Sequence, residues 1–153
     1  MASRPPKESA LLHPVITLFD KPGYSTLLEA RLSRKRIDIL FIPNTHGRWI
    51  AVELKVRDWK TALWQAAVNV QIADASYVAL WATSIPHALG RQELFKSYGV
   101  GIISVAECGA SVVLDAEYLP NSTRIRQQKH VLEQIAAANK KEGHLNALSV
   151  LPA

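Results

Sequence analysis

The sequence predicts an α/β fold in which helices flank a mixed central β-sheet. Helix-like and strand-like segments alternate along the chain in the order α-β-β-α-β-α-β-β-α, which is typical of a sheet covered by helices. Residues 76–82 are almost continuously apolar, as expected of a central strand that is buried on both faces. With 153 residues, 48% of them hydrophobic and 20% charged, the chain is long enough to bury a core.

One domain is expected over residues 14–142. Residues 1–13 are polar and rich in proline, which predicts a disordered N-terminal arm, and residues 143–153 are expected to form a tail. The single cysteine, Cys108, excludes an internal disulfide and a cysteine-based zinc cluster. The start lacks a long apolar segment and the apolar runs are too short to span a bilayer, so we expect a cytoplasmic protein.

Before residue 36 the sequence predicts one helix and one apolar segment whose structure it does not determine. Residues 15–19 are apolar and would form either a short strand or an apolar plug. Ser25 is a suitable N-cap, and apolar residues spaced by three and four after it predict a helix through about Ser33. Glu29 lies within this predicted helix.

A β-hairpin is predicted next, from two strands and the turn between them: residues 36–42, 49–56 and 43–48. If the hairpin is symmetric about Thr45 and His46, Asp38 lies opposite Glu53. Lys55 then shares a face with Glu53, because side chains alternate along a strand. Directly opposed carboxylates repel one another, so this register indicates a bound divalent cation and a metal-dependent hydrolytic site.

The alternative is an ordinary ion pair on a solvated sheet face, between Glu53 and either Lys55 or Arg36. Glu-x-Lys is a short motif, and a similar acid-x-Lys triplet begins at Asp58. Asp38 and Glu53, however, both interrupt apolar runs, where an unpaired buried charge is very costly. This context favours the metal site.

A helix is predicted over residues 59–74, with Asp58 as its N-cap. Its polar residues form a stripe at i, i+4 and i+8: Thr61, Gln65 and Asn69. Neighbouring alanines allow close approach to the sheet, so Gln65 would overhang the carboxylates, although a solvated helix face explains the stripe equally well. Pro86 is expected to open a loop. The remaining predicted elements are a strand, a helix, two strands and a last helix: residues 76–82, 91–98, 100–105, 111–114 and 122–141.

The chain is basic, with 18 lysine and arginine residues against 13 acidic residues, a formal charge of +5 and a pI of about 9.5. This balance is compatible with a polyanionic partner. Basic residues flank the candidate carboxylates, where a phosphate backbone would have to lie: Arg34, Lys35, Arg36, Arg57 and Lys60. Charge runs are also common on plain solvated faces, so an ordinary solvated surface is the alternative.

The order and spacing of these features resemble the PD-(D/E)XK nuclease superfamily, whose members share the restriction-endonuclease-like fold. The resemblance covers roughly residues 24–105. It is carried by four features in order. A predicted helix bears an acid, Glu29, and the following strand bears Asp38. The next strand holds the (D/E)-x-K element, Glu53-Leu54-Lys55, and a polar helix with Gln65 comes after it. Two features depart from the family pattern: Ile37 stands where the family often has proline, and no further strand completes the usual three-strand meander.

The resemblance implies a deoxyribonuclease that depends on Mg²⁺, with Mn²⁺ as a substitute. Asp38, Glu53 and the main-chain carbonyl of Leu54 would bind the metal, and Lys55 would orient or deprotonate the attacking water. Glu29 would bind a second metal or its water shell, and Gln65 would position the lysine or the DNA backbone. DNA is the expected partner. A homodimer is expected because a duplex cut has to address two strands.

Two other functions remain open. The first is a catalytically inactive protein that binds nucleic acid on a nuclease-like fold, although inactive members usually lose one of the triad residues, and all three are present here. The second is a small basic RNA-binding module, which would need an aromatic stacking motif that is not evident. The tryptophans lie in core-like segments and are expected to be packing residues: Trp49, Trp59, Trp64 and Trp81.

Overall fold

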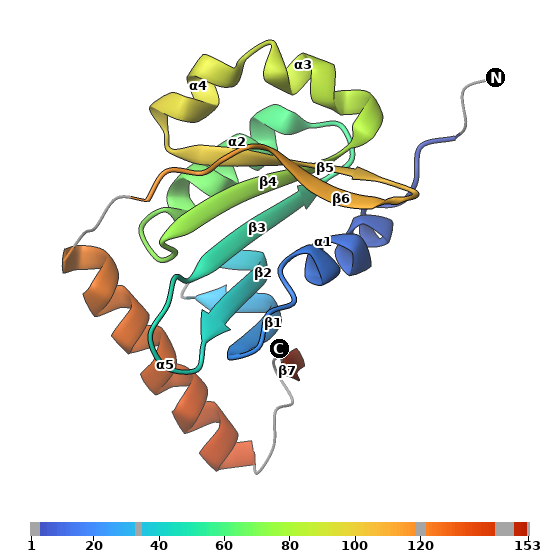
Figure 1. Cartoon of the computed structure of the whole chain (residues 1–153). Coiled ribbons are helices and arrows are strands. Elements are labelled where there is room, and N and C mark those ends of the chain that lie inside the picture. Colours follow the sequence, from blue (N-terminus) through green and yellow to red (C-terminus); the bar gives the residue numbers. More distant parts are fainter. Residues whose placement is uncertain (1–3, 33–34, 119–121, 143–148, 153) are drawn as a thin grey trace.

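The computed structural model describes residues 4–32, 35–118, 122–142 and 149–152. Its strands are β1 (Tyr24–Leu32), β2 (Lys35–Pro43), β3 (Ile50–Lys55), β4 (Ala75–Trp81), β5 (Val100–Ala106), β6 (Gly109–Leu114) and β7 (Ser149–Pro152). They form one sheet with the order β6-β5-β4-β3-β2-β1-β7 (Figure 1). β3, β4 and β5 run parallel, and the other neighbours pair antiparallel. This is the α/β class with a mixed sheet that the sequence predicts.

Helices cover both faces of the sheet: η1 (Glu8–Leu11), α1 (Leu12–Leu18), α2 (Trp59–Asn69), η2 (Ala82–Ser84), α3 (Ile85–Leu89), α4 (Gln92–Ser97) and α5 (Ser122–Glu142). η1 and α1 lie on one face, where Val15 and Val52 belong to the same buried core cluster. α2, α3 and α4 lie on the opposite face, where Leu63 packs with Val78 (Figure 1). α5 adds Val131 to a third cluster near β1, β2 and the start of β3.

The predicted helix from Ser25 to about Ser33 is wrong, because residues 25–32 belong to strand β1, which pairs with β2; residue 33 lies outside the described residues. Glu29 adopts a left-handed conformation with φ of 52° and interrupts the alternation of the strand. Leu27 and Ala30 therefore enter the same core cluster although they are three residues apart, a spacing that resembles a helix. β1 also supplies the strand before Asp38 that the sequence did not reveal.

The packed part of the chain begins earlier than predicted. Residues 8–18, assigned partly to a disordered arm and partly to a strand or plug, form η1 and α1. Leu11 and Val15, four residues apart, are fully buried against the sheet, and their burial holds these two helices on it. At the other end, the predicted tail contains β7, which pairs with β1, while residues 143–148 lie outside the described part.

The register of the predicted hairpin is confirmed. β2 and β3 pair as symmetry about Thr45 and His46 requires, with Phe41 opposite Ile50. α2 is shorter than predicted, and Pro86 lies within α3 instead of opening a loop, since proline is tolerated in the first turn of a helix. The other predicted strands and helices are present at nearly the predicted positions.

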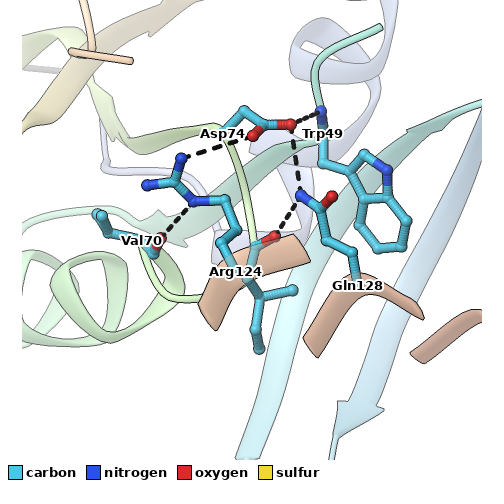
Figure 2. A network of polar contacts seen from close by, with 6 residues as sticks. Trp49, Val70, Asp74, Arg124 and Gln128 are labelled. Atoms are coloured by element: carbon cyan, nitrogen blue, oxygen red, sulfur yellow. Dashed lines mark hydrogen bonds and ion pairs between the residues drawn. The ribbon is translucent and has the colours of Figure 1, made fainter. Parts of the chain in front are cut away.

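A polar network fixes α5 against the sheet, as Figure 2 shows. Asp74 accepts a hydrogen bond from the main-chain N–H of Trp49 at 2.8 Å, and its carboxylate lies 3.5 Å from Nη1 of Arg124. Nε of Arg124 donates to the carbonyl oxygen of Val70 at 3.0 Å, and Nε2 of Gln128 donates to Asp74 at 3.3 Å. The network holds the segment that links α2 to β4, and so positions α2 over the sheet.

Candidate functional site

Two acidic side chains meet where β2 pairs with β3. The register places Asp38 opposite Glu53, one position beyond the pair of Ile39 and Val52. The main-chain N–H of Leu54 donates to Oδ2 of Asp38 at 2.9 Å, which fixes this carboxylate beside β3. Glu53 is buried beneath α2, with only 1% of its surface exposed. The carboxylate pair that the sequence predicts is therefore present.

The Glu53 carboxyl has an unusual affinity for protons. Burial, followed by the charge of the neighbouring Asp38, raises the pKa of Glu53 to about 8. A hydrogen bond from Asn69 and the positive charge of Lys35 act in the opposite direction. At neutral pH Glu53 therefore keeps a proton, within a hydrogen bond to Asp38. A proton held between two carboxylates occupies a position that a cation can take instead.

Asn69 is a residue of this site that sequence reasoning missed. Its Nδ2 donates to Oε1 of Glu53 at 2.9 Å, and its Oδ1 is buried without a hydrogen-bond partner in the described part of the chain. Gln65, the residue chosen from the same polar stripe, has an exposed side chain, and its main-chain carbonyl accepts a hydrogen bond from Lys35 at 2.7 Å. The polar stripe on α2 indicated that this helix faces the carboxylates. Which residue of the stripe contacts Glu53 depends on how α2 crosses β3.

The structure places Lys35, and not Lys55, at the hollow beside Glu53. Lys35, expected to contact DNA, lies close enough to Glu53 for their charges to interact, and burial lowers the pKa of Lys35 to about 8. Lys55, expected beside Glu53, has its Nζ 3.6 Å from Oε2 of Glu8 in η1. Lys55 lies at the end of β3, where a neighbour from the N-terminal segment was not foreseen because that segment was expected to be disordered.

The site opens to solvent as a hollow of about 550 Å³, here called the carboxylate hollow. Its lining comes from β2, β3 and α2: Lys35, Arg36, Asp38, Glu53, Trp64, Gln65 and Val68. The sequence-predicted residues Asp38, Glu53 and Gln65 are thus brought together. Lys55 is not part of the lining.

Glu29 lies near the site but does not line the hollow. It occupies the position of β1 across from Asp38, between the pairs that Leu28 and Ala30 make with β2. Its side chain is exposed, with Oε1 at 3.7 Å from Nη1 of Arg36. An exposed ion pair of this kind contributes little to stability.

The basic residues expected to bind DNA are spread around the hollow. Arg36 lines it directly. Arg57 lines a separate hollow together with Trp59, and Nζ of Lys60 lies 5.6 Å from the centre of the Trp59 ring. Arg34 lies outside the described residues.

The donor set at the site fits a hard divalent cation. Asp38 and Glu53 provide carboxylate oxygens, and Mg²⁺ is commonly held by one or two carboxylates with water completing its shell. Oδ1 of Asn69 is a further buried oxygen beside Glu53 that has no hydrogen-bond partner among the described residues. Within the described ranges no three His, Cys, Asp or Glu side chains are grouped as metal ligands, so a cation would depend on the two acids.

No protein-family model and no curated protein matches this chain. Among solved structures, the chain is similar to a protein of unknown function from Silicibacter pomeroyi, with 17% sequence identity and a TM-score of 0.52. The similarity covers 95% of this chain and 98% of the other. At this identity it bears on the fold alone, an α/β architecture with a mixed sheet flanked by helices. None of the described helices has the length and apolar character that crossing a lipid bilayer requires.

Proposed function

We propose that this protein is a metal-dependent nuclease of the PD-(D/E)XK type, with the restriction-endonuclease-like fold, that hydrolyses phosphodiester bonds in DNA. The observation that carries the proposal is the pairing of Asp38 with the buried Glu53 in an open hollow lined by basic residues. Folding brings two carboxylates together, and a bound cation would offset their repulsion. The meander of β1, β2 and β3, followed by α2 and the parallel strand β4, supports the same proposal because the family resemblance implies this arrangement.

In this proposal Asp38 and Glu53 hold Mg²⁺, or Mn²⁺ in its place, and the main-chain carbonyl of Leu54 is a further ligand. When bound, the metal supplies an activated water and neutralises charge on the phosphate. The N–H of Leu54 keeps the Asp38 carboxylate in place, and the Asn69 amide does the same for Glu53. Lys35 lies where its ammonium would offset the negative charge that develops on the phosphate during attack.

A second candidate function is nucleic-acid binding without hydrolysis. The contact between Lys55 and Glu8, outside the carboxylate hollow, favours it, because the resemblance assigns this lysine a role in activating water. The two candidates share DNA as the partner and differ only in whether the strand is cut. A single set of assays therefore separates them.

The test is cleavage of plasmid, linear duplex, single-stranded DNA and a four-way junction in Mg²⁺, Mn²⁺ or EDTA. We expect the wild type to cut in either metal and not in EDTA. Asp38→Asn and Glu53→Gln should each reduce the rate at least ~100-fold while the protein stays folded, because each removes a charged ligand. Glu93→Gln, an exposed carboxylate on α4, is the matched control and should cut at the wild-type rate. Full activity of either site variant would overturn the proposal.

Two variants, Lys35→Met and Lys55→Met, distinguish the roles of the two lysines in cleavage. If Lys35 serves the site, its variant loses at least ~10-fold in cleavage rate, and the Lys55 variant keeps most of the activity. The reverse result would give the role to Lys55, as the family resemblance implies. DNA binding by the wild type without cleavage in either metal would favour the second candidate.

A further inference from the structure

Trp64 is an exposed aromatic residue at the carboxylate hollow. The sequence predicts that the tryptophans are packing residues, which holds for the buried Trp49, whereas 53% of Trp64 is exposed. Its side chain lines the hollow together with Arg36. An indole that remains half in water beside two carboxylates contributes little to the core and is available to a ligand.

Tyr98 holds the Trp64 ring in a defined orientation. The ring centroids are 5.2 Å apart and the ring planes meet at 77°, an edge-to-face contact between α2 and the residue that follows α4. This is a favoured geometry for aromatic pairs. Because 40% of Tyr98 is also exposed, the two rings form a surface that is fixed by its own contact and still open to solvent.

Positive charges border this aromatic surface from both α2 and β2. Lys60 lies one helical turn before Trp64, and both residues are exposed. Arg36 lines the hollow and lies directly opposite Arg31 in the pairing of β1 with β2. The exposed Glu29 pairs with Arg36 and offsets part of the repulsion between the two arginines, and a bound polyanion would relieve the rest. Aromatic rings on which bases stack, next to cations that follow the backbone, are what proteins use to bind single-stranded nucleic acid.

We propose that Trp64 and Tyr98 form a stacking platform for an unpaired base beside the scissile phosphate, so that the substrate is single-stranded DNA or an unpaired DNA end. In a duplex each base is covered by its neighbours, and an indole reaches its face only after the base leaves the stack. The position of the scissile phosphate rests on the proposed nuclease function. The platform itself binds DNA without catalysis, so it is tested separately.

The experiment measures binding in EDTA by fluorescence anisotropy. The probes are a labelled oligothymidine, an abasic strand of the same length, and a blunt hairpin duplex. We expect Trp64→Ala to weaken binding of oligothymidine about tenfold, with less than a ~2-fold change for the duplex, because one lost stack removes most of the base contact. Trp64→Phe should recover most of the affinity. Val113→Ala, an exposed apolar residue on β6, is the control and should leave all three affinities unchanged.

The abasic strand makes the assignment specific to stacking. The wild type should prefer oligothymidine to the abasic strand about tenfold, and Trp64→Ala should lose this preference, because base and indole act as one pair. Wild-type affinity in the Trp64→Ala variant, or an equal loss on duplex and single strand, would overturn the platform. If the wild type cuts single-stranded DNA and Trp64→Ala binds and cuts it equally well, the platform fails and the nuclease stands. If single-strand binding depends on Trp64 but no metal supports cleavage, the nuclease fails and the platform stands.

Discussion

The ionisation of Glu53 is coupled to folding. Its pKa is about 8 in the folded protein, against an ordinary value of 4.5. Between these pH values the folded protein holds a proton that the unfolded chain has released, so the free energy of unfolding falls by up to roughly 1.4 kcal/mol per pH unit. The stabilising contribution is complete below about pH 4.5 and is lost as the pH rises through about 8. The lowered pKa of Lys35 acts at higher pH, where stability is regained between about 8 and 10.5.

Glu53→Gln should therefore flatten the loss of stability between about pH 5 and pH 8. Glutamine carries no charge and keeps an oxygen that can accept the hydrogen bond from Asn69. The measurement is urea unfolding across this pH range, and we expect the variant to be more stable than the wild type at the upper end. Glu93→Gln should follow the wild-type curve. Parallel curves for the wild type and Glu53→Gln would contradict a raised pKa at Glu53.

The meeting of Asp38 and Glu53 could be predicted because it depends only on strand alternation and hairpin symmetry, which are local rules. The partners of Glu53 could not be predicted in the same way. Lys35 and Asn69 reach it from the start of β2 and the end of α2, and these contacts depend on how the elements pack. Gln65 and Asn69 lie on one polar stripe, and nothing in the spacing says which of them meets the carboxylate.

Among the elements, the parallel strands β3 and β4 could be predicted from the sequence, whereas β1 could not. β3 and β4 are apolar runs bounded by turn or cap residues, and such runs predict buried strands. β1 contains Glu29 in the left-handed conformation, which costs roughly 1–2 kcal/mol for a residue with a side chain. This irregularity changes which residues are buried, so the apolar spacing of β1 imitates a helix. Only pairing with β2 and the core beneath it decide the structure.

Asp74→Ala should loosen α5 from the sheet. The change removes an anionic partner of Arg124, which is 2% exposed, and the acceptor for the Trp49 N–H, so we expect a loss of about 3 kcal/mol. Urea unfolding measures the loss, and hydrogen exchange along residues 124–138 should show that protection falls first in α5. Glu133→Ala, an exposed change on the same helix, is the control. Unaltered exchange in α5 would mean that the network does not hold it.

At the scale of the whole molecule, the proposed binding of DNA to a chain of formal charge +5 should weaken with salt. Each neutralised phosphate contributes about −0.7 to −0.9 to the slope of log affinity against log salt concentration. The double variant Arg57→Ala/Lys60→Ala should reduce the magnitude of this slope by about 1 to 2. Arg126→Ala/Lys129→Ala removes the same charge from exposed positions on α5 and should change it less. A slope near zero in the wild type would make the positive charge incidental.

The homodimer expected from the sequence stays a prediction. α5 exposes Ile125 and Leu132, by 66% and 48%, and these residues are seven apart and so lie on one side of the helix. Their side of α5 differs from the side of Val131, which packs on the sheet. If the protein forms a homodimer, we expect the second copy to contact this pair of apolar residues on α5.

The network around Asp74 also bears on how long a folded molecule survives. Arg124 meets Val70 across 54 positions of sequence, so α5 must close a long loop before it gains any contact with the sheet. The β3–α2–β4 unit joins segments that follow one another directly and should assemble earlier. Contacts of α5 would then form after the rate-limiting step of folding, and weakening them would accelerate unfolding and leave the folding rate nearly unchanged. Asp74 and Arg124 would thus set the lifetime of the native state and not the speed with which it is reached.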